Sequence, residues 1–230
     1  MKAIDMTERF EPMNGGLRRA AALQEEPRLE LVMARGTIAL VLLAAFAGSL
    51  PAAKFNKVLD IGKPAPAWTD LLGVDDKRHS LNDLKDAKLV VVAFACNHCP
   101  VVKAYERRLI QFVDDYRDKG VELVAISVSR QELDRLDKMK TRASEHGFNF
   151  PYLIDSTQKI AKAYGATVTP HVFVLDQKRR VAYMGKIDDQ LDETKVRERF
   201  LRDSVDALLS GQPPEVTETR PFGCEIDYSE

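Results

Sequence analysis

The stretch "FACNHCPVVKAYE", residues 94–106, holds two of the three cysteines of this chain, separated by two residues. It follows an apolar, β-branched run at residues 88–95, which is typical of a strand buried on both faces of a sheet. It leads into residues 97–119, where apolar side chains recur every three or four positions, as on one face of a helix. Two cysteines at such a junction can bind a metal, form a structural disulfide, or cycle between dithiol and disulfide.

The rest of the chain continues to alternate strands and helices. The apolar runs predict strands at residues 121–128, 150–155, 171–176 and 181–187, and the last two are close enough to form a hairpin. The amphipathic segments predict helices at residues 131–146, 157–165 and 192–209. This order predicts an α/β fold with a mixed central sheet that is flanked by helices on both faces.

The N-terminal part resembles a targeting segment. Residues 37–50, "TIALVLLAAFAGSL", carry no charge, and Arg35 precedes them. A basic residue, an apolar run of this length and small residues after it are typical of a secretory signal peptide, although a buried helix or an uncleaved anchor would also fit. We expect residues 1–53 to be an N-terminal extension plus a signal peptide or anchor, and residues 54–230 to form one domain. Within the first segment, translation is expected to start at Met33. The expected location is the periplasm or cell envelope.

Composition excludes several classes of partner. The chain has 34 basic and 35 acidic residues, and this balance gives no basic surface for nucleic acid. Three cysteines are too few for a disulfide-rich scaffold. We therefore expect no nucleic-acid partner, and contact with a membrane only through an uncleaved N-terminal anchor.

Two motifs carry a resemblance to a known family. A buried strand that ends in Cys-x-x-Cys before a long helix resembles the thioredoxin fold, and "IAKAYGATVTPHVFVLD", residues 160–176, resembles the second signature of that fold. The motif "CNHCPVVKAYE" and the tail "PFGC" resemble exported proteins of the redoxin branch, the alkyl hydroperoxide reductase and thiol-specific antioxidant group. The resemblance covers about residues 60–226. It implies a thioredoxin-like fold, a cis-proline loop at Thr169-Pro170 beside the cysteines, and no cofactor.

The resemblance and general thiol chemistry together predict a thiol–disulfide oxidoreductase. We expect Cys96 to be the nucleophile, because a position at the start of a helix and a protonated His98 would favour its thiolate. Cys99 is expected to be more deeply buried and to resolve the mixed disulfide between Cys96 and a substrate. Substrates would be disulfides or thiols of exported proteins, and a redox partner would recharge the pair.

The chain differs from its families at several positions. Thioredoxins carry a buried acid on the strand six residues before the first cysteine, where this chain has Val90, and usually a tryptophan just before it, where this chain has Ala95. The proline and threonine that precede a peroxidatic cysteine are absent before both Cys96 and Cys99. The proton relay is therefore unassigned, and peroxide reduction is the weaker alternative.

Other functions remain open for the remaining sulfur and imidazole groups. Cys224 is either an ordinary tail cysteine or a third redox thiol that receives the disulfide from Cys96 and Cys99 or links to a partner. A copper carrier would use the two motif cysteines with His98 and His171 as ligands, since sulfur favours copper(I). His171 follows the proline directly and is expected as a strand residue more than as a catalyst.

Overall fold

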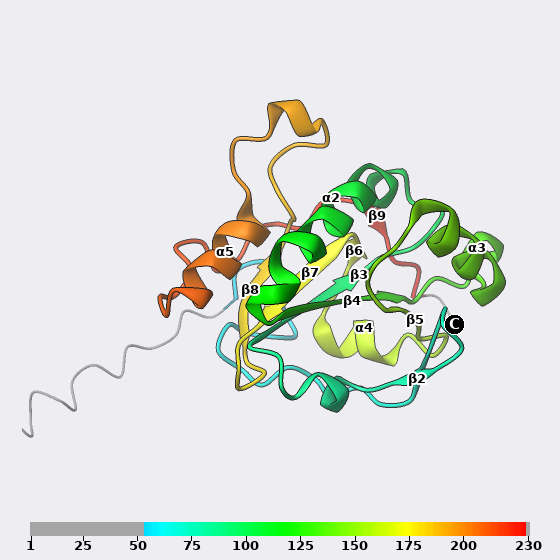
Figure 1. Ribbon diagram of the computed structural model, residues 1–230, viewed down its shortest axis with the longest axis horizontal. Coiled ribbons are helices and arrows are strands. Elements are labelled where there is room, and N and C mark those ends of the chain that lie inside the picture. Colours follow the sequence, from blue (N-terminus) through cyan, green and yellow to red (C-terminus); the bar gives the residue numbers. More distant parts are fainter. Residues whose placement is uncertain (1–52, 229–230) are drawn as a thin grey trace, which may run out of the picture. The chain divides into compact units, whose positions relative to one another are not determined.

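A mixed sheet runs through the centre of the computed structural model, which describes residues 53–228 (Figure 1). Its strand order in this part of the chain is β2-β1-β5-β4-β3-β7-β8. Central strand β3 pairs in parallel with β4 and antiparallel with β7. The strands are β1 (Leu71–Gly73), β2 (Arg78–His79), β3 (Leu89–Phe94), β4 (Val121–Ser127), β5 (Tyr152–Ile154), β7 (His171–Leu175) and β8 (Val181–Gly185).

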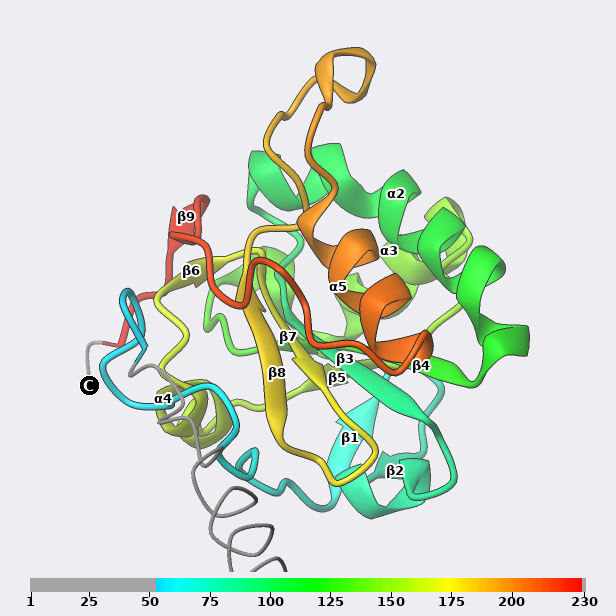
Figure 2. The same ribbon diagram turned by 90° about the vertical axis from the view of Figure 1, so that its left-hand side faces the viewer.

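Helices cover both faces of this sheet, as predicted (Figure 2). They are α2 (Pro100–Tyr116), α3 (Leu136–His146), α4 (Lys159–Tyr164) and α5 (Phe200–Leu209), with short 3-10 helices η2 (Leu81–Leu84), η3 (Arg117–Lys119), η4 (Glu132–Asp134) and η5 (Glu193–Lys195). Alternate side chains of β3 point to opposite faces: Val91 packs with α2, α3 and α5, whereas Val92 packs with α4. Every residue of β3 is buried, which explains its continuous apolar sequence.

All four predicted helices begin later than expected, and for α4 the difference is two residues. The helix predicted from residue 97 begins at Pro100, a residue that favours the first turn of a helix because it has no N–H to satisfy. The segment at 131–146 divides into η4 and α3, because Arg135 between them has an extended backbone. The segment at 192–209 divides in the same way, with Val196 extended after η5 and α5 beginning at Phe200.

The sequence analysis did not predict four short strands. Strands β1, β2, β6 (Val168–Thr169) and β9 (Cys224–Glu225) have two or three residues each, too few to show a period of two. Strands β6 and β9 form a separate antiparallel sheet in which Thr169 is opposite Cys224. This small sheet brings the C-terminal part of the chain to the start of β7.

The peptide bond between Thr169 and Pro170 is cis, as the resemblance implied. It lies between β6 and β7, so the chain turns there from the small sheet into the central one. Strand β7 pairs with β3 up to His171 opposite Phe94. The proline loop therefore lies at the end of β3 from which the cysteine motif emerges.

The predicted signal peptide or anchor lies outside the described residues, apart from its last position, residue 53. Within residues 53–228, no helix has the length and apolar character needed to cross a membrane.

Candidate active site

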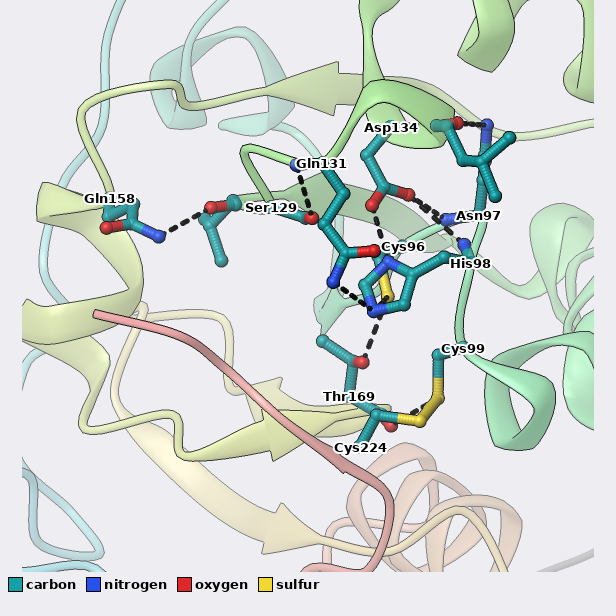
Figure 3. A network of polar contacts seen from close by, with 12 residues as sticks. Cys96, Asn97, His98, Cys99, Ser129, Gln131, Asp134, Gln158, Thr169 and Cys224 are labelled. Atoms are coloured by element: carbon teal, nitrogen blue, oxygen red, sulfur yellow. Dashed lines mark hydrogen bonds and ion pairs between the residues drawn. A yellow bond between two sulfur atoms is a disulfide. The ribbon is translucent and has the colours of Figure 1, made fainter. Parts of the chain in front are cut away.

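Thr169 is the common neighbour of all three cysteines (Figure 3). Its hydroxyl oxygen lies 3.2 Å from the Cys96 sulfur, and its carbonyl oxygen lies 3.2 Å from the Cys99 sulfur. Its backbone pairs with that of Cys224 across the two-stranded sheet. The structure thus brings together Cys96, Cys99, Cys224 and the Thr169-Pro170 loop.

The disulfide in this structure joins Cys99 to Cys224, which are 125 residues apart in the sequence. Their Cα atoms are 5.9 Å apart, within the usual range for a disulfide. Cys96 is a free thiol. The expected pair was Cys96 and Cys99, and the difference follows from strand β9, which places Cys224 beside the first turn of α2. The sequence analysis left Cys224 open as a tail cysteine or a third redox thiol, and the structure brings it to Cys99.

A buried carboxylate contacts the two residues between the motif cysteines. Asp134 in η4 is 1% exposed, and its Oδ2 lies 2.5 Å from Nδ1 of His98. Oδ2 accepts the hydrogen of Nδ1, which leaves Nε2 of His98 as an acceptor, and the side-chain amide of Gln131 donates to it at 3.4 Å. That Nε2 lies 3.9 Å from the Cys96 sulfur. The thiol of Cys96, the imidazole of His98 and the carboxylate of Asp134 therefore lie in the order that a nucleophile, a base and an orienting acid require.

The two residues between the cysteines hold the η4 segment against the motif. The backbone N–H groups of Asn97 and His98 both donate to Oδ1 of Asp134, at 2.5 and 3.2 Å. The Asn97 side chain donates to the Leu133 carbonyl at 2.9 Å and accepts from the Tyr152 hydroxyl at 3.1 Å. The sequence analysis missed Asp134, because one acid in the polar run "RQELDRLDK" has no local feature that distinguishes it.

The Cys96 thiol is protonated in this state. Burial raises the pKa of Cys96 to about 11; the nearby Asp134 charge also raises it, and the Thr169 hydrogen bond lowers it. We expected a lowered pKa from the start of a helix, and that expectation was wrong for this oxidised state. Helix α2 begins at Pro100, so Cys99 is its N-cap residue and Cys96 precedes the first turn. A proton acceptor is needed to form the thiolate.

His171 does not join the cysteine cluster. It is 2% exposed in β7 and packs beside Phe173, with ring centroids 4.5 Å apart. Burial lowers the pKa of His171 to about 3, so its ring is neutral. The structure therefore places it as the strand residue that we expected, and it contributes no ligand near the sulfur atoms.

Among the described residues, one group has the spacing of a metal site. The ligand atoms of Cys96, His98 and Asp134 lie within 4.8 Å of one another. Both oxygens of Asp134 already accept hydrogen bonds from the motif, and the Cys99 sulfur is held in a disulfide. Of the four copper ligands considered in the sequence analysis, His171 lies apart in β7 and the sulfur of Cys99 is held in a disulfide. The remaining cluster is held together by its own hydrogen bonds.

A cavity of about 360 Å³ leads to the Cys96 sulfur. Besides the active-site residues Cys96, His98 and Thr169, it is lined by residues 128–131 after β4 and by residues 225–227 of the C-terminal segment. The same C-terminal part of the chain that carries Cys224 thus forms one wall of the entrance to the free thiol.

The raised pKa of Cys96 predicts how its alkylation depends on pH. In the oxidised protein, iodoacetamide can react only with Cys96, because the other two cysteines form a disulfide. A thiolate is the reacting form, so the rate should rise about tenfold per pH unit from neutrality and level off only near pH 11. The rate is measured by mass spectrometry of the intact protein.

The matched control is the same oxidised protein in concentrated urea, where the Cys96 rate should level off near the ordinary thiol pKa of about 8.5. A rate in the folded protein that levels off at or below that pH would contradict the prediction.

Comparisons with known proteins identify the family of this chain. The family model described as Redoxin matches residues 60–198. The thiol-disulfide oxidoreductase ResA of Bacillus anthracis is 29% identical over 144 residues, which cover 62% of this chain and 75% of ResA. Two solved structures are similar over most of their length. A hypothetical protein from Sinorhizobium meliloti 1021 has a TM-score of 0.71 and 32% identity over 77% of this chain and 99% of its own. An uncharacterized conserved protein from Geobacillus kaustophilus has a TM-score of 0.70 and 35% identity over 79% of this chain and 98% of its own.

These comparisons confirm the predicted thioredoxin-like α/β fold and the predicted class of enzyme, a thiol–disulfide oxidoreductase. The model match covers more than half of the sequence, and it includes the motif cysteines, Asp134 and the Thr169-Pro170 loop. The chain belongs to the Redoxin family.

Proposed function

We propose that this enzyme exchanges disulfides with exported proteins, with Cys96 as the nucleophile. The observation that carries the proposal is a single free thiol backed by His98 and Asp134, beside a disulfide that involves the second cysteine of the motif. A free thiol next to a proton acceptor and a second thiol is what disulfide exchange requires.

The first step is removal of the proton from Cys96. Nε2 of His98 faces the sulfur and takes the proton, and the Asp134 carboxylate stabilises the imidazolium that forms. The Thr169 hydroxyl can then donate a hydrogen bond to the thiolate. Thioredoxins have a buried acid at the position of Val90 on β3. In this chain the acid is Asp134 of η4, and it acts through His98.

Disulfide exchange at Cys96 and Cys99 proceeds in two covalent steps. The Cys96 thiolate attacks a substrate disulfide, one substrate sulfur leaves, and the proton held by His98 returns to it. The reduced form of Cys99 then attacks the Cys96 sulfur, which releases the second substrate thiol and leaves a disulfide between Cys96 and Cys99. Each turnover reduces one substrate disulfide and oxidises two cysteines, so a redox partner must return two electrons. The reverse direction oxidises a substrate dithiol.

Substitution of Cys96 by serine tests the nucleophile. The full-length Cys96→Ser variant should lose the reduction of insulin by dithiothreitol, because no other thiol is aligned with the His98 relay. The double variant Cys99→Ser, Cys224→Ser should retain the first attack and accumulate a mixed disulfide on Cys96, which mass spectrometry detects. Retention of insulin reduction by Cys96→Ser would refute the proposed function.

Substitution of Asp134 tests the relay. In Asp134→Asn an amide faces His98 and favours the tautomer with hydrogen on Nε2, so the ring no longer accepts the Cys96 proton. The turnover rate at pH 7 should fall by about 100-fold, and the difference from the wild type should narrow above pH 10, where hydroxide forms the thiolate directly.

The control is Asp137→Asn, an exposed acid at the start of α3 whose side chain is 69% exposed. It should leave the rate and its pH profile unchanged. An equal loss at every pH in Asp134→Asn would indicate a structural role only.

We further propose that the domain, residues 54–230, acts outside the cytoplasm, that translation starts at Met33, and that the signal peptide or anchor within residues 1–53 directs export. The support is the apolar run at residues 37–50 after Arg35 and a disulfide of a kind that persists in oxidising compartments. Expression of the full chain followed by cell fractionation should place it in the envelope or periplasm, and N-terminal sequencing should locate the cleavage site or show an uncleaved anchor. Recovery of the whole chain in the cytoplasm would contradict the proposal.

A further inference from the structure

The turnover described above ends with a disulfide between Cys96 and Cys99, whereas the structure has one between Cys99 and Cys224. We propose that Cys224 takes over the disulfide from the motif, so that Cys99 changes partner and Cys96 returns to the free thiol. This inference rests on the proposed function, which supplies the Cys96–Cys99 disulfide. It makes Cys224 the third member of the redox site and the sulfur on which the recharging partner acts.

The exchange step conserves thiols, disulfides and electrons. The Cys224 thiolate attacks the Cys99 sulfur, the bond between Cys96 and Cys99 breaks, and the bond between Cys99 and Cys224 forms. Cys96 leaves as a thiolate, and the proton that Cys224 lost reaches it by way of solvent and His98. No external oxidant or reductant takes part, because one disulfide replaces another.

The contacts of Thr169 gather the three cysteines of the exchange around one residue. The sulfurs of Cys96 and Cys99 touch its hydroxyl and carbonyl oxygens, both at 3.2 Å, and its backbone pairs with Cys224. Figure 3 shows Thr169 between the Cys96 sulfur and the Cys99–Cys224 disulfide. After the exchange, the hydroxyl of Thr169 is in place to hold the regenerated Cys96 thiol.

The C-terminal segment, residues 222–228, is held at the site by contacts that do not depend on the disulfide. The side chains of Ile226 and Tyr228 pack against the apolar cluster on the α4 face of the sheet. Its hydrogen bonds run from Ile226 N to Thr167 O (2.9 Å), from Gln158 Nε2 to Asp227 O (2.7 Å) and from the Tyr228 hydroxyl to Ala166 O (2.7 Å). These contacts keep reduced Cys224 at a high effective concentration beside Cys99.

Gly223 is the residue that lets the segment approach so closely. A Cβ atom at this position would lie 2.0 Å from the Thr169 carbonyl oxygen, a backbone atom that cannot move aside. Any larger residue would push the segment away from β6, and with it Cys224. The glycine of "PFGC" is therefore a steric requirement for the disulfide, independent of the sulfur chemistry.

Exposure indicates what the exchange achieves. Cys99 is 0% exposed and does not line the cavity, so a partner thiolate reaches a Cys96–Cys99 disulfide only through the cavity over Cys96, which substrates also use. Cys224 is only partly buried. A partner thiolate can attack the Cys224 sulfur, with the Cys99 thiolate as the leaving group, and so return electrons to the site. Cys96 is meanwhile free to attack a further substrate.

The test follows the disulfides through one turnover. Fully reduced full-length protein in excess is mixed with insulin, quenched with acid at a series of times, and alkylated before mass spectrometry. Trypsin cuts after Lys88, Lys103 and Arg202, so Cys96 and Cys99 share one peptide and Cys224 lies on another. We expect the Cys96–Cys99 disulfide to appear first and then decay into Cys99–Cys224, with Cys96 becoming alkylated again.

Two variants separate this proposal from its alternatives. Cys224→Ser should still reduce one equivalent of insulin but should end with a Cys96–Cys99 disulfide and lose the renewed alkylation of Cys96. Gly223→Ala should give the same result with all three cysteines present, whereas the neighbouring control Phe222→Ala, an exposed residue, should behave as the wild type.

The proposal is overturned if Cys96–Cys99 is the stable product in the wild type, or if Cys99–Cys224 forms at the same rate in Cys96→Ser. Either result leaves the proposed function intact as long as Cys96→Ser fails to reduce insulin. If that variant reduces insulin, the proposed function itself fails.

Discussion

The contacts of Thr169 are the constraint on which the active site depends. Its hydroxyl and carbonyl oxygens touch two sulfurs, and its backbone pairs with the segment that carries the third. The residue is held by β6 on one side and by the cis bond to Pro170 on the other. Because β7 continues from this loop into the central sheet beside β3, the position of all three cysteines is tied to the pairing of the two central strands.

The second constraint is the burial of charge behind the motif. An ionised carboxylate out of water needs several hydrogen-bond donors, and Asp134 has them from the backbone and ring of the residues between the cysteines. Asn97 and His98 thus serve the site as directly as the cysteines do. This arrangement also replaces the strand acid of thioredoxins, because a valine at position 90 can pack in the dry interior of the sheet while the acid approaches from the loop after β4.

The C-terminal segment links stability and chemistry. It closes the small sheet, fills part of the α4 face and lines the cavity over Cys96. The segment therefore lines the entrance to the free thiol of Cys96, and it also carries Cys224, the disulfide partner of Cys99. The alternative functions are less well supported by this arrangement. The metal-ligand set is engaged in hydrogen bonds, and the sequence before Cys96 has Leu89 and Ala93 where a peroxidatic motif has proline and threonine.

The sequence by itself determined the strand that ends in Cys-x-x-Cys, the helix that follows, the late hairpin and the proline loop. These features depend on periodicity, composition and a motif within one segment, so they can be read locally. Helix starts were less accurate, because single backbone changes at Arg135 and Val196 interrupt a continuous amphipathic pattern. The partner of Cys99 and the acid behind His98 were decided only by the tertiary structure. Cys224 lies 125 residues from Cys99 and Asp134 lies in a separate loop, and such contacts form only when packing of the sheet and helices brings distant segments together.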